Sequence, residues 1–415
     1  MLLVSNHSNA LVDPLLPVIL LRRHVTLTAK NVLARNPLLG LLARGLGAVL
    51  FHRVSDVSKG ADPRQNTGSM ARCGEILQGG GAIAIFPEGV SHSDLKMRPF
   101  RTGVARIALD FVAAHPGRAL HLVPIGLHYT AKARFRSDVW VRFGPPLEVG
   151  AWCRGHPEAD AGALTDEVRQ RIEQQVLSFE SREEMVVLHY VAEIMATQGR
   201  MPRALGSVEP AVSEWFRSLA LLQDGYRKLV ARRRPEIDAL SERVRTYRSE
   251  LKRLGVEPAE VYLPLHAARA ALFLVRELEL FAVGAPLAAF GALNFLVPYL
   301  VVRSLARALS KDRDQWASNV VYPSLVIFPL YALAILGAVW ATLPAFWAAV
   351  YTVALPYTGY YALLYGDRTA GAWRRARTFL YWLFHRSRQS RLAQEGREIV
   401  AAVHALGAEL EAEAS

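Results

Sequence analysis

The sequence predicts an α/β domain, then a charged helical region and a membrane-embedded helical part. Three observations support this prediction. Strand-like apolar runs alternate with helix-like segments through residues 1–150. Residues 151–262 are helical in pattern and rich in both acids and bases. Segments 280–302 and 321–365 then contain no charged residue, which is typical of membrane segments.

The α/β domain is assigned from short apolar runs separated by helix signals. Asp13 followed by Pro14 is a natural start for the first helix, with Asp13 as the N-cap. The expected strands are Leu2–Ser5, Val25–Ala29, Ala48–Phe51, Ala82–Phe86, Leu120–Leu127 and Val139–Phe143. The expected helices are Pro14–Arg22, Pro37–Leu46, Pro63–Leu77 and Thr102–Ala114.

Residues 263–365 are expected to hold the membrane segments. Val321–Leu343 and Pro344–Leu364 are each long enough to cross a bilayer, and their tight join predicts a helical hairpin. Leu280–Val302 is a third candidate, interrupted by prolines; a buried soluble helix is the alternative for all three. The part before these segments, the loop Arg303–Ser318 and the tail after Arg368 are all Arg-rich, which favours the cytoplasm for all three. Three full crossings cannot place them on one side, so a re-entrant or interfacial 280–302 is preferred.

The charge balance indicates an anionic partner. The chain has 49 Lys and Arg against 37 Asp and Glu, a net charge of +12. Apolar residues make up 52%, which favours lipid over nucleic acid. Residues 366–415 begin with arginines interleaved with aromatic residues, so we expect an interfacial helix on anionic phospholipid there. Two cysteines are too few for a four-cysteine zinc site or a disulfide framework.

The residues Asn6-His7 follow the first expected strand, and Asp13 follows shortly after. This layout can place an imidazole at a sheet edge with a carboxylate near one ring nitrogen, as a general base requires. The alternative is a helix-capping Asp beside an unrelated His. Six positions rotate a helix by about 600°, so the residues between them must loop or bulge to bring the pair together.

A second signal follows the strand-like run that ends at Phe86. Glu88 and Gly89 come where open α/β sheets place ligands, although a plain turn also explains them. Cations follow at Lys96, Arg98 and Arg101, just before a helix start that would favour a phosphate. Arg53 is another cation at a strand end; a solvated charge cluster is the alternative reading.

These signals occur in an order that resembles the glycerolipid (glycerol-phosphate and lysophospholipid) acyltransferases. The family's Asn-His-x4-Asp block is similar to Asn6–Asp13, and its apolar run ending in Arg is similar to Gly47–Arg53. Its Phe-Pro-Glu-Gly and Val-Pro-Ile blocks are Phe86–Gly89 and Val123–Ile125. The resemblance covers residues 1–150 and implies a domain with a mixed sheet flanked by helices.

The resemblance also implies roles for single residues. His7 would be the base and Asp13 its partner, while Arg53, Glu88 and Gly89 would hold the acceptor's glycerol phosphate. Pro124 would shape the acyl or acceptor site. The implied mechanism is direct attack of the acceptor hydroxyl on a thioester, in agreement with the absence of a serine nucleophile elbow from the sequence.

Two departures refine the resemblance. His7 and Asp13 are separated by five residues rather than four, as in the fungal-type glycerol-3-phosphate/dihydroxyacetone-phosphate acyltransferases. Ser91-His92 stands where the family often has Thr-Arg, so Lys96 or Arg101 is expected to supply the missing charge.

The expected function is acyl transfer to glycerol 3-phosphate or dihydroxyacetone phosphate in phospholipid biosynthesis. Lysophosphatidate is the alternative acceptor, and a catalytically silent lipid-binding membrane protein is the alternative of another class. Acyl-CoA or acyl carrier protein is the expected co-substrate, with no further cofactor, no metal and no nucleic acid. The protein is expected to be membrane-integral with its catalytic domain facing the cytoplasm.

Overall fold

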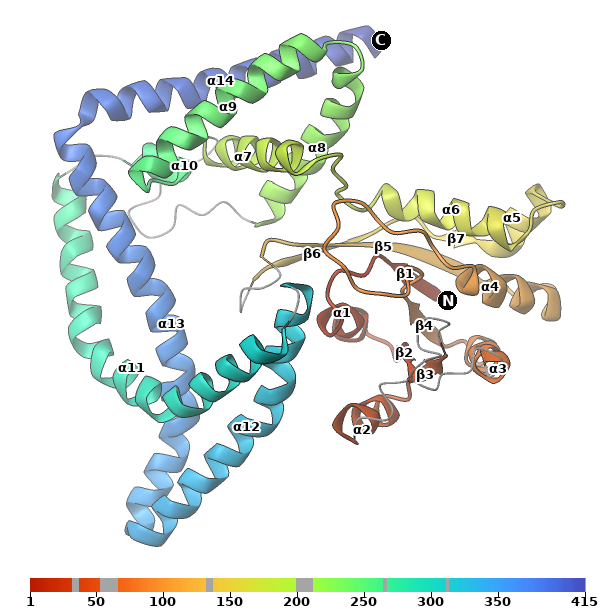
Figure 1. Ribbon diagram of the computed structural model, residues 1–415, viewed down its shortest axis with the longest axis horizontal. Helices are drawn as coiled ribbons and strands as arrows, with labels where there is room; N and C mark the ends of the chain where they lie inside the picture. Colours follow the sequence, from red (N-terminus) through yellow and green to blue (C-terminus); the bar gives the residue numbers. More distant parts are fainter. Residues whose placement is uncertain are drawn as a thin grey trace. The chain divides into compact units, whose positions relative to one another are not determined.

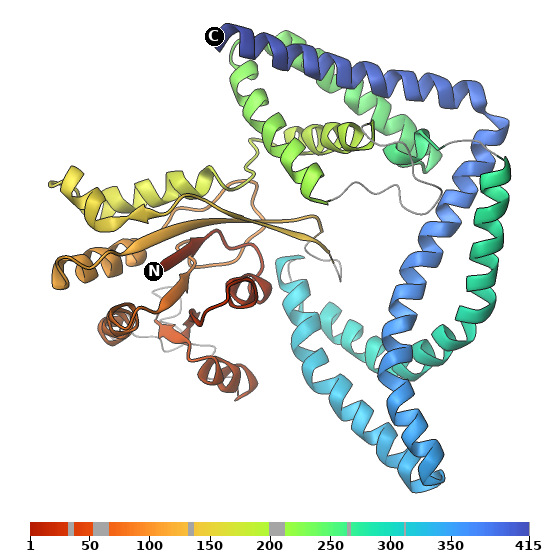
Figure 2. The same ribbon diagram turned by 180° about the vertical axis from the view of Figure 1, so that it is seen from behind.

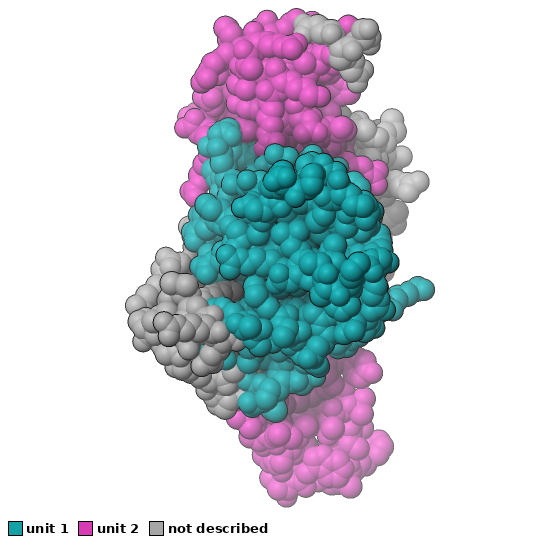
Figure 3. Space-filling model, turned by 90° about the vertical axis from the view of Figure 1, so that its right-hand side faces the viewer, with its two compact units in different colours: residues 1–180, 311–318 teal, residues 181–310, 319–415 magenta. Residues whose placement is uncertain are grey.

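The computed structural model describes residues 1–31, 37–52, 66–131, 137–198, 212–263, 267–310 and 313–414. The chain forms two compact units, shown in different colours in Figure 3. The first comprises Met1–Glu180 with Lys311–Ser318, and the second Ser181–Ser310 with Asn319–Ser415.

The first unit contains a mixed seven-stranded sheet (Figure 1). Its main strand order is β3-β2-β4-β1-β5-β6, and β7 pairs with β5. The pairs from β3 to β5 are parallel, whereas β6 and β7 run antiparallel to β5. The strands are β1 (Leu2–Ser5), β2 (Val25–Lys30), β3 (Val49–Phe51), β4 (Ala82–Ile85), β5 (His121–Tyr129), β6 (Val139–Phe143) and β7 (Leu147–Glu148).

Both faces of this sheet are covered, as the alternation along β1 demonstrates. Leu2 and Val4 enter one core with helices α3, α4 and α6, whereas Leu3 enters the core on the opposite face with α1. The helices of this unit are α1 (Val12–Leu20), α2 (Pro37–Gly45), α3 (Asn66–Gln78), α4 (Gly103–Ala114), α5 (Val149–Gly155) and α6 (Ala161–Glu173).

The strand predictions for Leu2–Ser5 and Val139–Phe143 are confirmed to the residue, and the mixed sheet is confirmed. The predicted start of the first helix is wrong. The helix begins at Val12, so Asp13 lies in its first turn and is not its N-cap. The short strand β7 escaped prediction because two residues carry no periodicity.

The first compact unit continues past residue 150, where the sequence suggested a boundary. Helix α6 contributes Leu164, Val168 and Ile172 to the same core as β1 and β4, and each is almost fully buried. Burying these apolar side chains stabilises the unit, so residues 151–180 belong with the sheet.

The second unit is helical and has its own core. Trp382 is fully buried and donates its indole N–H to the Glu260 carbonyl oxygen, at 3.0 Å. Its helices are α7 (Arg182–Gln198), α8 (Val212–Val230), α9 (Arg234–Leu254), α10 (Pro258–Val261), α11 (Ala267–Leu309), α12 (Arg313–Thr342, whose first residues group with the first unit), α13 (Ala345–Phe384) and α14 (Arg386–Ala414).

Two helical segments within the described residues are long and apolar enough to cross a membrane. They are Phe281–Leu309 and Asn319–Thr342. Pro286 and Pro298 do not interrupt the first of these segments, because helix α11 runs through both prolines. The helix is bent, as Figures 1 and 2 show. The predicted segment 344–364 lies within the longer helix α13, which continues without a break into the arginine-rich stretch. The predicted tight join at Leu343–Pro344 is present between α12 and α13.

Candidate active site

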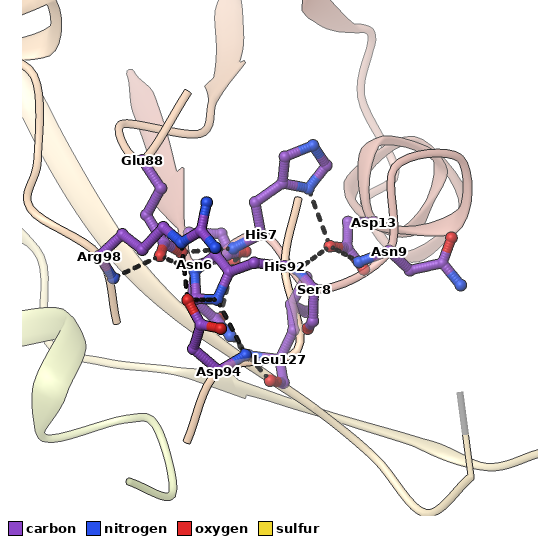
Figure 4. A network of polar contacts seen from close by, with 11 residues as sticks. Asn6, His7, Ser8, Asn9, Asp13, Glu88, His92, Asp94, Arg98 and Leu127 are labelled. Carbon is purple, nitrogen blue, oxygen red and sulfur yellow. Dashed lines mark hydrogen bonds and ion pairs between the residues drawn. The ribbon is translucent and has the colours of Figure 1, made fainter. Parts of the chain in front are cut away.

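Neighbouring strands of the sheet bring the candidate residues together. His7 follows β1, Glu88 follows β4, and Tyr129 is the last residue of β5. Because β1 lies between β4 and β5 and is parallel to both, the three carboxyl ends meet at one edge. Figure 4 shows the polar network that forms there.

Asp13 is fully buried and accepts hydrogen bonds on both carboxylate oxygens. Oδ2 accepts from the backbone N–H groups of Ser8 (2.6 Å) and Asn9 (2.7 Å), and lies 3.0 Å from His7 Nδ1. Oδ1 accepts from the Tyr129 hydroxyl at 2.5 Å. A buried carboxylate requires such compensation for the hydration it has lost. The proximity of His7 and Asp13 predicted from the sequence is therefore confirmed.

This arrangement determines the tautomer of His7. A carboxylate can only accept, so a neutral imidazole paired with it carries its proton on Nδ1. Nε2 then keeps a free lone pair, and Figure 4 shows it pointing away from Asp13. The His7 ring stacks on Phe86 with a centroid distance of 4.4 Å, which holds its plane. A neutral imidazole oriented in this way has the form of a general base.

The segment between His7 and Asp13 is a turn, as the unusual spacing requires. The Asn9 side chain accepts from the N–H groups of Leu11 and Val12, both at 3.2 Å, where helix α1 begins. Asn9, not Asp13, therefore provides the side-chain acceptor at the helix start. The Asp13 carboxylate is therefore available to contact His7. The predicted loop is present at residues 8–11, whereas Val12 is already the first residue of helix α1.

Asn6 anchors the residue before the base to the neighbouring strand. Its side-chain amide donates to the Leu127 carbonyl oxygen (3.0 Å) and accepts from the Leu127 N–H (2.8 Å). These two bonds replace the backbone ladder where β1 has ended, so the position of His7 is tied to β5.

Glu88 is buried, and each of its carboxylate oxygens accepts a hydrogen bond from a backbone N–H group of the site. Oε1 accepts from the His7 backbone N–H and Oε2 from the Arg98 backbone N–H, both at 2.8 Å. Oε2 also contacts His92 Nε2. Glu88 thus joins the loop after β4 to the loop after β1. Its predicted contact with an acceptor stays a prediction.

Gly89 and Arg101 lie against each other. Gly89 has φ +75°, a conformation that favours glycine, and an added Cβ would lie 3.0 Å from Arg101 Nε. The Arg101 backbone N–H also donates to the Pro87 carbonyl oxygen at 3.0 Å. The Arg101 side chain is exposed, two residues before helix α4, so a cation and a helix start coincide beside the loop.

The remaining predicted residues are more scattered. Lys96 is exposed and ion-paired with Glu180. Pro124 is buried within β5 opposite Val4, in the middle of the sheet rather than at its edge. Arg53 lies outside the described residues.

Sequence reasoning missed the parts played by Tyr129, Asn9 and His92. Tyr129 ends the strand that carries the Val-Pro-Ile motif, and this placement at a carboxyl end was a usable signal. Asn9 and His92 were visible in the motifs, but their partners depend on loop geometry that no residue pattern specifies.

A buried imidazole–carboxylate pair at the carboxyl edge of an α/β sheet defines a class of site that activates a hydroxyl or a water. The family comparison makes the class specific: residues 1–128 match the family model described as Acyltransferase, so this segment is an acyltransferase-family domain.

Curated relatives point in the same direction. Glycerol-3-phosphate O-acyltransferase 2 of Saccharomyces cerevisiae is 27% identical over 263 residues, 61% of this chain and 34% of the relative. Glycerol-3-phosphate O-acyltransferase 1 of the same yeast is 27% identical over 184 residues, 43% of this chain and 23% of the relative. An uncharacterized acyltransferase of Schizosaccharomyces pombe is 44% identical over 70 residues, 17% of this chain and 10% of the relative. The matched part is thus about a third or less of each relative's length.

Among solved structures, the 1-acyl-sn-glycerophosphate (LPA) acyltransferase PlsC from Thermotoga maritima matches with a TM-score of 0.30 and 19% identity. The match covers 42% of this chain and 64% of that one.

Proposed function

We propose that the chain is an O-acyltransferase that moves a fatty acyl group from a thioester carrier to glycerol 3-phosphate or dihydroxyacetone phosphate. The observation that carries the proposal is His7, held by Asp13 with Nε2 directed away from the carboxylate. The acyltransferase-family match over residues 1–128 and the yeast relatives support the same reaction.

The reaction is a direct transfer. Nε2 of His7 takes the proton of the acceptor hydroxyl while the hydroxyl oxygen attacks the thioester carbonyl carbon. The tetrahedral intermediate collapses, the C–S bond breaks, and the leaving thiolate receives the proton from the imidazolium. The products are an ester and a free thiol. Asp13 stabilises the transient positive charge on the imidazole.

The acceptor's phosphate is assigned to the loop after β4. Arg101 is exposed, and its side chain packs against Gly89, which has no Cβ to displace it. A guanidinium is suited to binding a phosphate. Lys96 and Arg53 are further candidate cations. Within the same chemistry, lysophosphatidate is the alternative acceptor, because it presents the same phosphate with an acyl chain already attached.

The proposed donor is acyl-CoA or acyl carrier protein, with no additional cofactor. We propose membrane phospholipid as the surrounding partner, because Phe281–Leu309 and Asn319–Thr342 are apolar enough to cross a bilayer. Arginine-rich flanks favour a catalytic domain facing the cytoplasm. Nucleic acid is not a proposed partner.

The experiment measures thiol release by the purified full chain with long-chain acyl-CoA. Glycerol 3-phosphate, dihydroxyacetone phosphate and lysophosphatidate are supplied separately. Release that depends on either of the first two supports the proposal, and release only with lysophosphatidate supports the alternative acceptor. No acceptor-dependent release with acyl-CoA or acyl carrier protein would instead indicate a silent lipid-binding protein.

A further inference from the structure

We propose that Tyr129 is a positioning residue of this site, acting through Asp13 to hold His7 ready as the base. The inference rests on the proposed acyl transfer, but its central measurement does not require activity. Tyr129 is the only tyrosine among residues 1–180, and it lies at the carboxyl end of β5. That end meets the end of β1 because the two strands are parallel neighbours.

The hydrogen bonds of Asp13 are divided between its two oxygens. Oδ2 contacts His7 and two backbone N–H groups, whereas the hydroxyl of Tyr129 contacts Oδ1. The bond from Tyr129 engages the other oxygen, so both oxygens of the buried carboxylate are held. The Tyr129 hydroxyl also compensates part of the negative charge that faces the imidazole.

Tyr129 remains a donor under ordinary conditions. Burial raises the pKa of the Tyr129 hydroxyl, and the adjacent Asp13 charge and hydrogen bond raise it further. The phenol therefore stays protonated and presents its O–H to Asp13. A charge-assisted bond of this kind is stronger than one between neutral groups.

Loss of the hydrogen bond from Tyr129 to Asp13 should shift the titration of His7 in one direction. Without the O–H, more of the carboxylate's negative charge is left uncompensated toward the imidazole, which favours the protonated ring. The titration of His7 should then move to higher pH, and the fraction available as a base at neutral pH should fall. Two other titratable residues contact the His7 backbone, both from the loop after β4. Glu88 accepts a hydrogen bond from the His7 N–H, and the His92 backbone N–H donates to the His7 carbonyl oxygen.

The test compares Tyr129→Phe with the wild-type chain. Turnover should fall by roughly 10-fold, the effect of losing a hydrogen bond to a charged group, with the KM for acceptor unchanged. The acid limb of kcat/KM should move to higher pH. The titration of His7, followed by ¹⁵N NMR of the labelled imidazoles and assigned with His7→Gln, should move in the same direction.

A double-mutant cycle separates positioning from a general loss of structure. In the Asp13→Asn background, Tyr129→Phe should leave the titration of His7 unchanged, because the group through which it acts is absent. Tyr226→Phe in the second unit is the control and should leave both the titration and turnover unchanged. An unshifted His7 titration in Tyr129→Phe, or an equal shift in both backgrounds, overturns the inference. Absence of wild-type thiol release overturns only the proposed function, since the titration is still measured.

Discussion

The other polar groups at this edge of the sheet hold His7 in position. Replacing it with alanine removes the imidazole but none of the hydrogen bonds that its backbone makes to Glu88 and His92. We therefore expect His7→Ala to lower turnover by roughly 10²–10⁴ with the fold retained, as for the loss of a general base. Thiol release and circular dichroism of the purified variant test this. Turnover like that of the wild type would remove His7 from the mechanism.

Asp13 tests the orientation of the imidazole. In Asp13→Asn one oxygen becomes an NH₂ group, which must face a donor: Tyr129, His7 or a backbone N–H. Turnover should fall nearly as far as in His7→Ala, by roughly 10²–10⁴, with little change in the KM for acceptor. Steady-state kinetics at saturating acyl-CoA measures both. A nearly silent Asp13→Asn would mean that another group orients His7.

At the scale of elements, Glu88 connects the loops after β1 and β4. Glu88→Gln keeps the shape, but its amide NH₂ cannot accept from the N–H groups of His7 and Arg98 at both positions. Because these bonds place the base, kcat should fall by roughly 10-fold or more. The KM for acceptor should change less than in Arg101→Ala, the comparison variant. A rise in KM for acceptor with unchanged kcat would instead assign Glu88 to acceptor binding.

Helix α7 carries a pH-sensitive contribution to stability. Burial and the nearby Glu257 carboxylate raise the pKa of Glu193 to about 7 from its ordinary value of 4.5. The folded state therefore binds more protons than the unfolded state between these values, so the free energy of unfolding falls as pH rises through this window. Glu193→Gln stays neutral and should raise Tm at pH 8 relative to wild type, with a smaller gain at pH 5.

Thermal unfolding of the chain in detergent at the two pH values measures this effect. Glu183→Gln, at an exposed position in the first turn of the same helix, is the control and should change Tm by the same amount at both pH values. Equal gains at pH 5 and pH 8 in Glu193→Gln would contradict the assignment.

For the whole molecule, membrane retention should depend on the two long apolar helices. Leu293 in α11 and Leu333 in α12 are 69% and 66% exposed, so arginine at both positions should disturb little internal packing. Each arginine near a helix centre costs about 2.5–3.5 kcal/mol of insertion free energy. The double variant should be released by alkaline carbonate more readily than wild type.

Leu221→Arg is the control for membrane retention, since Leu221 is 74% exposed but lies in α8, outside both candidate segments. Fractionation followed by immunoblotting compares pellet and supernatant. A double variant that pellets as completely as Leu221→Arg would assign retention to other parts of the chain.

Across the whole chain, prediction succeeded where the determinants are local. The strand Leu2–Ser5 was predictable because it is a short apolar run. The loop after His7 was predictable once His7 and Asp13 were taken as a pair, because a continuous helix would place residues six positions apart on different faces. Helix boundaries were less accurate: Asn9 supplies the side-chain acceptor expected of Asp13. The prolines of α11 did not mark its ends, because long helices tolerate proline with a bend.

The sequence by itself determined the α/β class and the apolar character of the C-terminal helices, since these follow from residue type and periodicity. It made His7 and Asp13 candidate partners, and the structure places His7 Nδ1 3.0 Å from Asp13 Oδ2. Only the tertiary structure decided that Tyr129 contacts Asp13 and that Glu88 binds the His7 backbone. The physical reason is the strand order. β1 lies between β4 and β5, and this order brings together residues 81 and 116 positions apart along the chain. No local pattern specifies which strands become neighbours, because that choice depends on burying both faces of the sheet at once.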